Sequence, residues 1–195
     1  ADQSVHTLVL RGDGRHFCTG LDLTDLATLS DGDLLLRLVR IETLLALLWH
    51  APIRTVALAH GRTWGAGADL FAVCEQRLVH PDTTLRFPGA QFGIVLGTRR
   101  LAERIGVDAA RALVLEGGEL DAREALALGL ATQLGDTAAE LAAPRPDAAT
   151  ARAIRSATRT DRRDADLAAL VRSAARPGLQ MRITAYRARL LAAVA

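Results

Sequence analysis

The stretch RTVALAHGRTWGAGA, residues 54–68, decides the fold. Its first part, Arg54–Ala59, is apolar through its middle, which predicts a strand buried on both faces. A glycine-rich turn over residues 60–67 follows and leads into a helix over residues 68–75. Small residues let a ligand approach the backbone, and a helix start offers unpaired N–H groups. This corner either holds an oxygen on which negative charge develops or is a tight turn that needs glycine only for packing.

A second loop follows an earlier strand. Residues 5–10 are apolar and β-branched and predict a strand, and the segment FCTGLDL, residues 17–23, comes after it. Gly20 and the amides around it then lie where a parallel strand ends, and ligands of open α/β sheets gather outside such ends. Two small-residue loops after two strands resemble the paired halves of an oxyanion hole.

Strands and helices alternate along the chain, which favours an α/β class with mostly parallel pairing. Ser30 and the residues after it are expected to cap a long helix that runs to about His50, before Pro52. Further strands are expected over residues 77–80 and 84–87, and helices over residues 98–105, 107–115 and 121–128. Residues 136–147 predict a linker, and residues 148–195 a helical C-terminal region that is split near residues 176–178.

Composition excludes several classes of protein. Of the 195 residues, 50% are hydrophobic and 24% are charged, which is enough apolar side chain for a packed core. The net charge of +2 argues against a large electrostatic surface for nucleic acid. Every basic residue is arginine, so neither a Schiff-base lysine nor a P-loop lysine exists here. The lack of lysine and asparagine, whose codons are AT-rich, indicates a GC-rich bacterial genome.

No metal site, disulfide scaffold or membrane span is expected. The five histidines show no metal-ligand spacing. The two cysteines, Cys18 and Cys74, show no paired spacing, which favours a reducing cytoplasm. The longest apolar stretch, residues 34–49, is interrupted by charged side chains, whereas a spanning helix needs ~20 predominantly apolar residues.

Five segments, in order along the chain, resemble motifs of the crotonase superfamily, the enoyl-CoA hydratase/isomerase family. The first two are FCTGLDL at residues 17–23, similar to F-x-x-G-x-D-L/I, and AHG with WGAGADL at residues 59–61 and 64–70, similar to N-G…GGG-x-E-L. The third, CEQR at residues 74–77, is similar to C-D-x-R. The fourth, LRFP through FG at residues 85–93, is similar to F-x-x-P-E-x-x-x-G. The fifth comprises LDA, EAL and GLA between residues 120 and 131 and is similar to A-x-E-A…G-L-V. The resemblance implies an α/β crotonase-like fold of stacked ββα turns with a helical C-terminal region. Its core, residues 1–135, would lack the family's N-terminal strand segment.

The resemblance also implies the site. The backbone N–H groups of Leu21 and Ala66 would form an oxyanion hole that holds the carbonyl oxygen of an acyl-CoA or acyl-carrier thioester and stabilises an enolate. The family further implies a homotrimer or dimer of trimers, no metal, and no cofactor apart from the coenzyme A of the substrate. The implied substrate-binding residues are Gly20, Trp64, Gly65, Gly67 and Gly89.

The acid/base groups depart from the family's pattern. Asp69 stands where hydratases of the family have the first of two glutamates and is the candidate catalytic residue. Alternatively, it is an acid that the dipole of a first helical turn favours. Gly89 stands at the second glutamate and carries no acid. Trp64 either walls the acyl pocket or is a core aromatic.

Two classes of function remain open. The first is an enzyme on thioesters that isomerises, decarboxylates or hydrates with a single acid, since the two-glutamate route is not expected. The second is a catalytically weakened homologue that binds a thioester or a partner enzyme as an accessory subunit.

Overall fold

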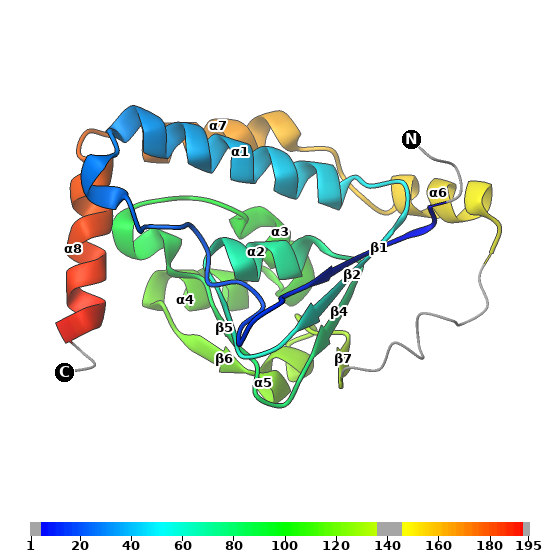
Figure 1. The fold of residues 1–195 in the computed structure, drawn as a ribbon. Coiled ribbons are helices and arrows are strands. Elements are labelled where there is room, and N and C mark those ends of the chain that lie inside the picture. The colour runs from blue at the N-terminus through cyan, green and yellow to red at the C-terminus, as the bar shows by residue number, and fades with distance from the viewer. Residues whose placement is uncertain (1–4, 136–145, 193–195) are drawn as a thin grey trace.

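Two sheets organise the chain, which a computed structural model describes over residues 5–135 and 146–192 (Figure 1). The larger sheet is wholly parallel, in the order β1 (Thr7–Arg11), β2 (Arg54–Ala59), β4 (Gln76–Val79), β7 (Gln133–Leu134). In the smaller sheet, β3 (Arg62–Trp64) pairs parallel with β5 (Thr84–Arg86), which pairs antiparallel with β6 (Glu119–Asp121). The α/β class, the mostly parallel pairing and the bounds expected for β2 are confirmed.

Helices pack on the sheets and form the C-terminal region, which is interrupted near residues 176–178, as the sequence predicts, and also at residues 158–162, which was not predicted. The long helix α1 begins after Ser30, whose hydroxyl accepts a hydrogen bond from the Asp33 amide at 3.1 Å while the Asp33 carboxylate accepts one from the Ser30 amide. This reciprocal cap satisfies two amides of the first turn. The helices are α1 (Asp31–Trp49), α2 (Ala66–Val73), α3 (Thr98–Ile105), α4 (Val107–Glu116), α5 (Ala122–Ala127), α6 (Ala148–Ala157), α7 (Arg163–Ala174) and α8 (Leu179–Ala192), with short 3-10 helices η1 (Leu26–Thr28) and η2 (Pro88–Phe92).

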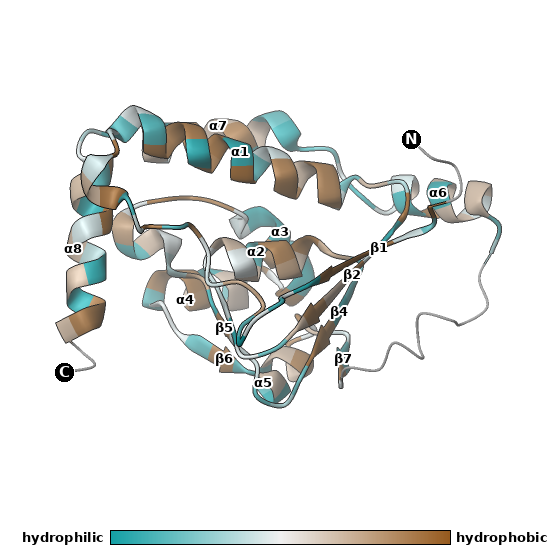
Figure 2. Cartoon of the chain, viewed as in Figure 1, coloured by the Kyte–Doolittle hydropathy of each residue, from teal (hydrophilic) through white to brown (hydrophobic). Residues whose placement is uncertain are grey.

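Apolar clusters hold these layers together, and two of them lie near the site described below. The first lies around β2 and α2 and contains the fully buried Phe71, Leu85 and Leu101; Figure 2 shows the brown strands and α2 that contribute to it. The second joins α1 to α7 and α8 through buried leucines and isoleucines, among them Leu38 and Ile183. The second cluster fixes the C-terminal helices beside α1. Within residues 5–135 and 146–192, no helix has both the length and the apolar character to cross a bilayer.

The structure corrects the prediction at its shortest strands. Residues 60–67, expected as one turn, contain the three-residue strand β3, and neither β6 nor β7 was expected. Strands of two or three residues are too short to show an alternating pattern, so pairing partners elsewhere in the chain decide them. Most of the expected linker, residues 136–145, lies outside the described residues, and the domain boundaries stay a prediction.

Gly67 packs directly on the loop that follows β1. A Cβ at this position would lie 2.0 Å from the carbonyl oxygen of Cys18, which is backbone and cannot move alone. We expect Gly67→Ala to lower the free energy of unfolding by about 1–3 kcal/mol or more, measured by urea denaturation. Gly14→Ala is the matched control, because a Cβ there meets nothing within 4 Å. Equal stability of the two variants would show that the loop can shift without cost.

Candidate active site

The loop after β1 runs alongside β3 and brings its amides to the start of α2. The Trp64 amide donates to the carbonyl of Cys18 at 2.9 Å, and Cys18 bridges Thr63 in parallel register. Gly20 has a φ of +101°, and a Cβ on it would lie 3.3 Å from the Ala66 nitrogen. Only glycine fits at position 20, because φ is positive there and because the backbones of the two loops approach each other closely.

Leu21 and Ala66 both line one cavity. Among the described residues, neither of these two N–H groups donates a hydrogen bond. Ala66 is the first residue of α2, so its amide has no acceptor within the helix and carries part of the positive end of the helix dipole. Two free donors at one cavity are suited to bind an oxygen that gains negative charge.

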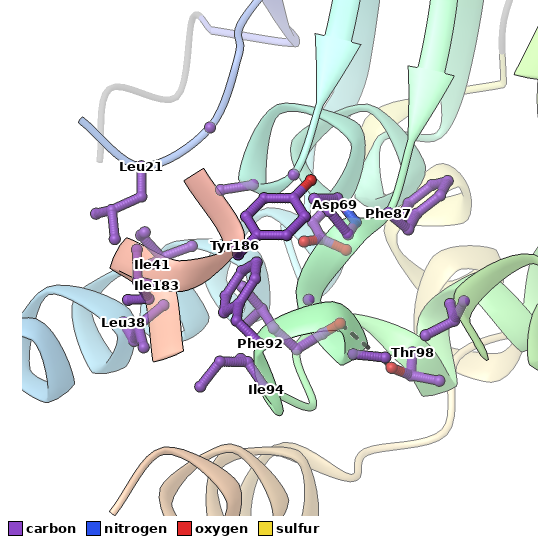
Figure 3. A pocket seen from close by; sticks show the side chains of 18 of the residues that line it. Leu21, Leu38, Ile41, Asp69, Phe87, Phe92, Ile94, Thr98, Ile183 and Tyr186 are labelled. Carbon is purple, nitrogen blue, oxygen red and sulfur yellow. Dashed lines mark hydrogen bonds between the residues drawn. The ribbon is translucent and has the colours of Figure 1, made fainter. Parts of the chain in front are cut away.

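The cavity around these amides is mostly apolar. Aliphatic and aromatic side chains form most of its wall, several of them from α1, η2 and α8, and Figure 3 shows Leu38, Ile41, Phe92 and Ile183 among them. The polar side chains in the wall are Thr19, Asp69, Thr98 and Tyr186. Such a wall favours a ligand with an apolar body and few polar atoms.

Asp69 lies in the first turn of α2 and is 6% exposed. Its carboxyl group faces the cavity (Figure 3) and has no hydrogen-bond partner among the described residues. Burial raises the pKa of Asp69 well above its ordinary value, Glu42 raises it further, and Arg100 opposes the shift. A carboxyl group whose pKa is moved toward neutrality is suited to exchange protons near physiological pH.

Gly97, at the start of α3, packs against that carboxyl group. Its φ is +66°, and a Cβ on it would lie 2.1 Å from Oδ1 of Asp69. Any side chain at position 97 would therefore occupy the space that the Asp69 carboxyl group fills. The loop before α3 is short, so α3 begins directly beside Asp69.

A buried ion pair lies next to Asp69. Arg100, from α3, donates to both carboxylate oxygens of Glu42, from α1, at 2.6 and 3.0 Å. Asp166, from α7, lies 3.1 Å from the same guanidinium. Both Arg100 and Glu42 are nearly inaccessible to solvent, so their charges act on Asp69 with little screening.

The family model described as Enoyl-CoA hydratase/isomerase matches residues 1–165 of this chain. The chain belongs to the enoyl-CoA hydratase/isomerase family. A crystal structure of a homologue from Bordetella parapertussis, named as an enoyl-CoA hydratase/isomerase, is 45% identical with a TM-score of 0.88, covering 93% of this chain and 80% of that one. An enoyl-CoA hydratase structure from Bacillus halodurans, 22% identical with a TM-score of 0.78 and covering 94% and 83% of the two chains, supports the fold.

Curated relatives of this family match a shorter region. The "Probable enoyl-CoA hydratase echA6" of Mycobacterium bovis is 34% identical over 141 residues, which is 70% of this chain and 56% of that protein. Ethylmalonyl-CoA decarboxylase of Gallus gallus is 33% identical over 127 residues, which is 63% of this chain and 43% of that protein. The chain thus spans about half the length of these relatives.

The structure brings together most, but not all, of the site residues predicted from family motifs. Leu21, Ala66 and Asp69 line one cavity with Gly20, Gly65 and Gly89. Gly89 lies in η2, where its carbonyl accepts from the Ile94 amide at 2.8 Å, and the position offers no acid.

Trp64 and Gly67 lie outside the cavity wall. Trp64 donates from Nε1 to the Thr84 hydroxyl at 3.0 Å, and the guanidinium of Arg62 stacks on its ring at 4.7 Å. Its side chain therefore packs on the smaller sheet. Gly67 contacts the Cys18 backbone, as described above.

Residues of α8 also line the cavity, and the sequence does not predict them as site residues. Ile183 and Tyr186 line the cavity, and the Tyr186 ring packs on Phe92 with centroids 5.1 Å apart. The C-terminal region shows only helical spacing in the sequence, so no local pattern indicates which turn reaches the site. A single tyrosine in an otherwise alanine- and arginine-rich helix was the one available signal.

Proposed function

We propose that this member of the family is an enzyme that moves a proton on the acyl part of an acyl-CoA or acyl-carrier thioester through an enolate. The observation that carries the proposal is Asp69, a buried carboxyl group that has no hydrogen-bond partner among the described residues and faces an apolar cavity lined also by Leu21 and Ala66, whose amides donate to no described residue. An acid with a structural role at a helix start is normally exposed, and its carboxylate accepts hydrogen bonds from the free amides of the first turn. Asp69 is buried and, within the described residues, accepts no such hydrogen bond.

The two amides supply electrostatic stabilisation. The thioester oxygen accepts from the N–H groups of Leu21 and Ala66, and the negative charge that moves onto it in the enolate strengthens both hydrogen bonds. Removal of one such donor typically costs 10²–10³ in rate. The requirement is for backbone geometry, so any side chain that fits the wall can stand at residue 21.

Asp69 supplies the proton chemistry. As a carboxylate it takes a proton from the carbon next to the thioester carbonyl, and the electrons of that C–H bond move to the oxygen held by the amides. The raised pKa of Asp69 makes its carboxylate a stronger base than a solvated aspartate. Because the cavity wall is apolar, proton return to the acyl chain is favoured over addition of water, which supports isomerisation of a double bond as the reaction.

Decarboxylation is the second candidate, because Ethylmalonyl-CoA decarboxylases are among the relatives. Loss of carbon dioxide leaves the same enolate on the same two amides, and the apolar wall destabilises the substrate carboxylate. The proposal includes no metal and no cofactor beyond coenzyme A, and a trimer or dimer of trimers as the assembly, as family membership suggests.

The test is a comparison of three thioesters. We expect the purified chain to convert a β,γ-unsaturated acyl-CoA to its conjugated isomer, measured by the ultraviolet absorbance of the product, faster than it hydrates crotonyl-CoA. Release of carbon dioxide from ethylmalonyl-CoA would favour the second candidate. Binding of all three thioesters by calorimetry with no turnover of any would overturn the proposal and support an accessory subunit.

A further inference from the structure

Tyr186 is a second polar group of this cavity that can carry a proton. It is the chain's only tyrosine, and α8 carries it into the wall that also contains Asp69. Figure 3 shows its ring next to the Phe92 ring, with the hydroxyl pointing away from Phe92. Thr19 and Thr98, the other polar side chains of the wall, have hydroxyl groups that do not titrate in the range of enzyme activity.

Contacts at the start of α8 and in its first turn fix the position of Tyr186. At the start of the helix, the Asp31 carboxylate accepts from the amides of Gly178 and Gln180 at 2.8 Å each. One turn before Tyr186, Arg182 donates to the carbonyl of Phe92 at 3.1 Å. Ring packing on Phe92 completes the anchoring, so the phenol is held in place by helix docking.

The hydroxyl of Tyr186 is available to a ligand. Among the residues that the structure describes, it has no hydrogen-bond partner, although its side chain is half-buried. Burial raises the pKa of Tyr186, while Arg86 and Arg189 oppose the shift. The phenol therefore stays neutral at physiological pH, which makes it a donor under the conditions in which Asp69 acts as the acceptor.

We propose that Tyr186 is the proton donor of the cavity and takes the place of the acid that Gly89 lacks. This inference rests on the proposed function. The Asp69 carboxylate removes the α-proton of a β,γ-unsaturated thioester, which breaks that C–H bond and forms the dienolate on the amides of Leu21 and Ala66. Tyr186 then gives its proton to the γ-carbon, a new C–H bond forms and a tyrosinate remains. The proton on Asp69 passes through water to the tyrosinate, which restores both groups.

Tyr186→Phe is the first test, because it keeps the ring on Phe92 and removes only the hydroxyl. We expect kcat to fall by ~10²-fold or more, KM to change by less than about threefold, and the alkaline limb of the pH–rate profile to disappear. Met181→Leu is the matched control on the same helix, since Met181 is 71% exposed and outside the cavity wall. An active wild type and an equally active Tyr186→Phe variant with the same alkaline limb would overturn the inference and leave the proposed function standing.

The origin of the new proton gives a second readout. In deuterium oxide, wild type is expected to place deuterium on the γ-carbon, because the exchangeable Tyr186 hydroxyl supplies it. In Tyr186→Phe, any residual reaction is expected to carry the substrate's own α-proton to the γ-carbon on Asp69. The same retention of the α-proton in both proteins, by mass spectrometry, would assign both transfers to Asp69 and overturn the inference.

Direct titration covers the case in which a variant does not fold. Because the chain has a single tyrosine, tyrosinate absorbance reports Tyr186 alone in the wild type. Saturating butyryl-CoA is expected to shift the titration midpoint by about one unit or more, since the ligand contacts the phenol. An unchanged midpoint with bound butyryl-CoA would overturn the inference. A chain that binds no thioester at all would overturn the proposed function with it.

Discussion

Asp69→Asn is expected to lower kcat for isomerisation by ~10²–10⁴-fold and to leave the dissociation constant for butyryl-CoA within about threefold. Asparagine keeps the size of the side chain and its fit against Gly97 but can neither accept nor return a proton. The amides of Leu21 and Ala66, which we propose as the oxyanion hole, stay in place, so binding of the thioester oxygen is expected to persist. Stopped-flow or steady-state absorbance measures kcat, and calorimetry measures binding.

The same variant has a second expected result, in the pH dependence of stability. The pKa of Asp69 is raised in the folded protein, so folding favours its protonated form. Stability from this group is fully present below the unfolded pKa, near 3.8, and is lost as pH rises through the folded value. Asp69→Asn cannot lose a proton. We therefore expect its free energy of unfolding to exceed that of wild type increasingly as pH rises above the unfolded pKa.

The two measurements separate function from structure. Activity of Asp69→Asn equal to that of wild type would remove Asp69 from the mechanism, whatever its stability. A stability difference between the two proteins that does not vary with pH would show that Asp69 ionises as easily in the folded chain as in the unfolded one. Asp108→Asn is the control for both, since Asp108 is on the surface of α4 with a side chain 97% exposed.

Much of the fold could be predicted because its main elements carry strong local signals. β2 is a continuous apolar run, and Ser30 with Asp33 forms the reciprocal cap that starts α1. β3, β6 and β7 carry no such signal, because a strand of two or three residues exists only through its partner. β3 forms because β5 and Cys18 lie on either side of it.

The backbone part of the candidate site was predictable and its side-chain part was not. Glycines mark the two loops whose amides meet, since the close approach of Gly20 to Ala66 excludes other residues. Tyr186 reaches the cavity because residues far away in sequence, among them Asp31 and Phe92, dock α8 there. The sequence also does not indicate that Trp64 packs on the smaller sheet. An aromatic residue beside glycines gives the same local pattern whether it lines a pocket or belongs to the core.

The Glu42–Arg100 pair gives the other large expected effect. Glu42→Gln keeps the side-chain shape but removes the negative charge from a bidentate, fully buried contact. Among the described residues, Asp166 is then the carboxylate that stays paired with Arg100, at 3.1 Å. Breaking a buried pair in this way typically costs 3–5 kcal/mol, because one charge remains buried without full compensation. We expect the unfolding free energy at neutral pH to fall by about that amount, measured by urea denaturation.

The sign of the effect on catalysis follows from the same contacts. Glu42 raises the pKa of Asp69 and Arg100 lowers it, so loss of the Glu42 charge leaves the guanidinium to stabilise the Asp69 carboxylate. The pKa of Asp69 should fall, and the acidic limb of the profile of kcat/KM against pH should move to lower pH. A less basic carboxylate removes a carbon-bound proton more slowly, so the plateau rate should fall as well.

A surface ion pair provides the comparison that decides between a structural and an electrostatic role. Glu103 contacts Arg99 one helical turn away on α3, and its side chain is 37% exposed. Glu103→Gln removes the same charge from beside Arg99, the neighbour of Arg100 on α3, and we expect it to change stability by less than about 1 kcal/mol without moving the acidic limb. If Glu42→Gln loses stability but keeps the wild-type acidic limb, the buried pair only holds α1 against α3. If that limb shifts in Glu42→Gln but not in Glu103→Gln, the Glu42–Arg100 pair between α1 and α3 also sets the pKa of Asp69 on α2.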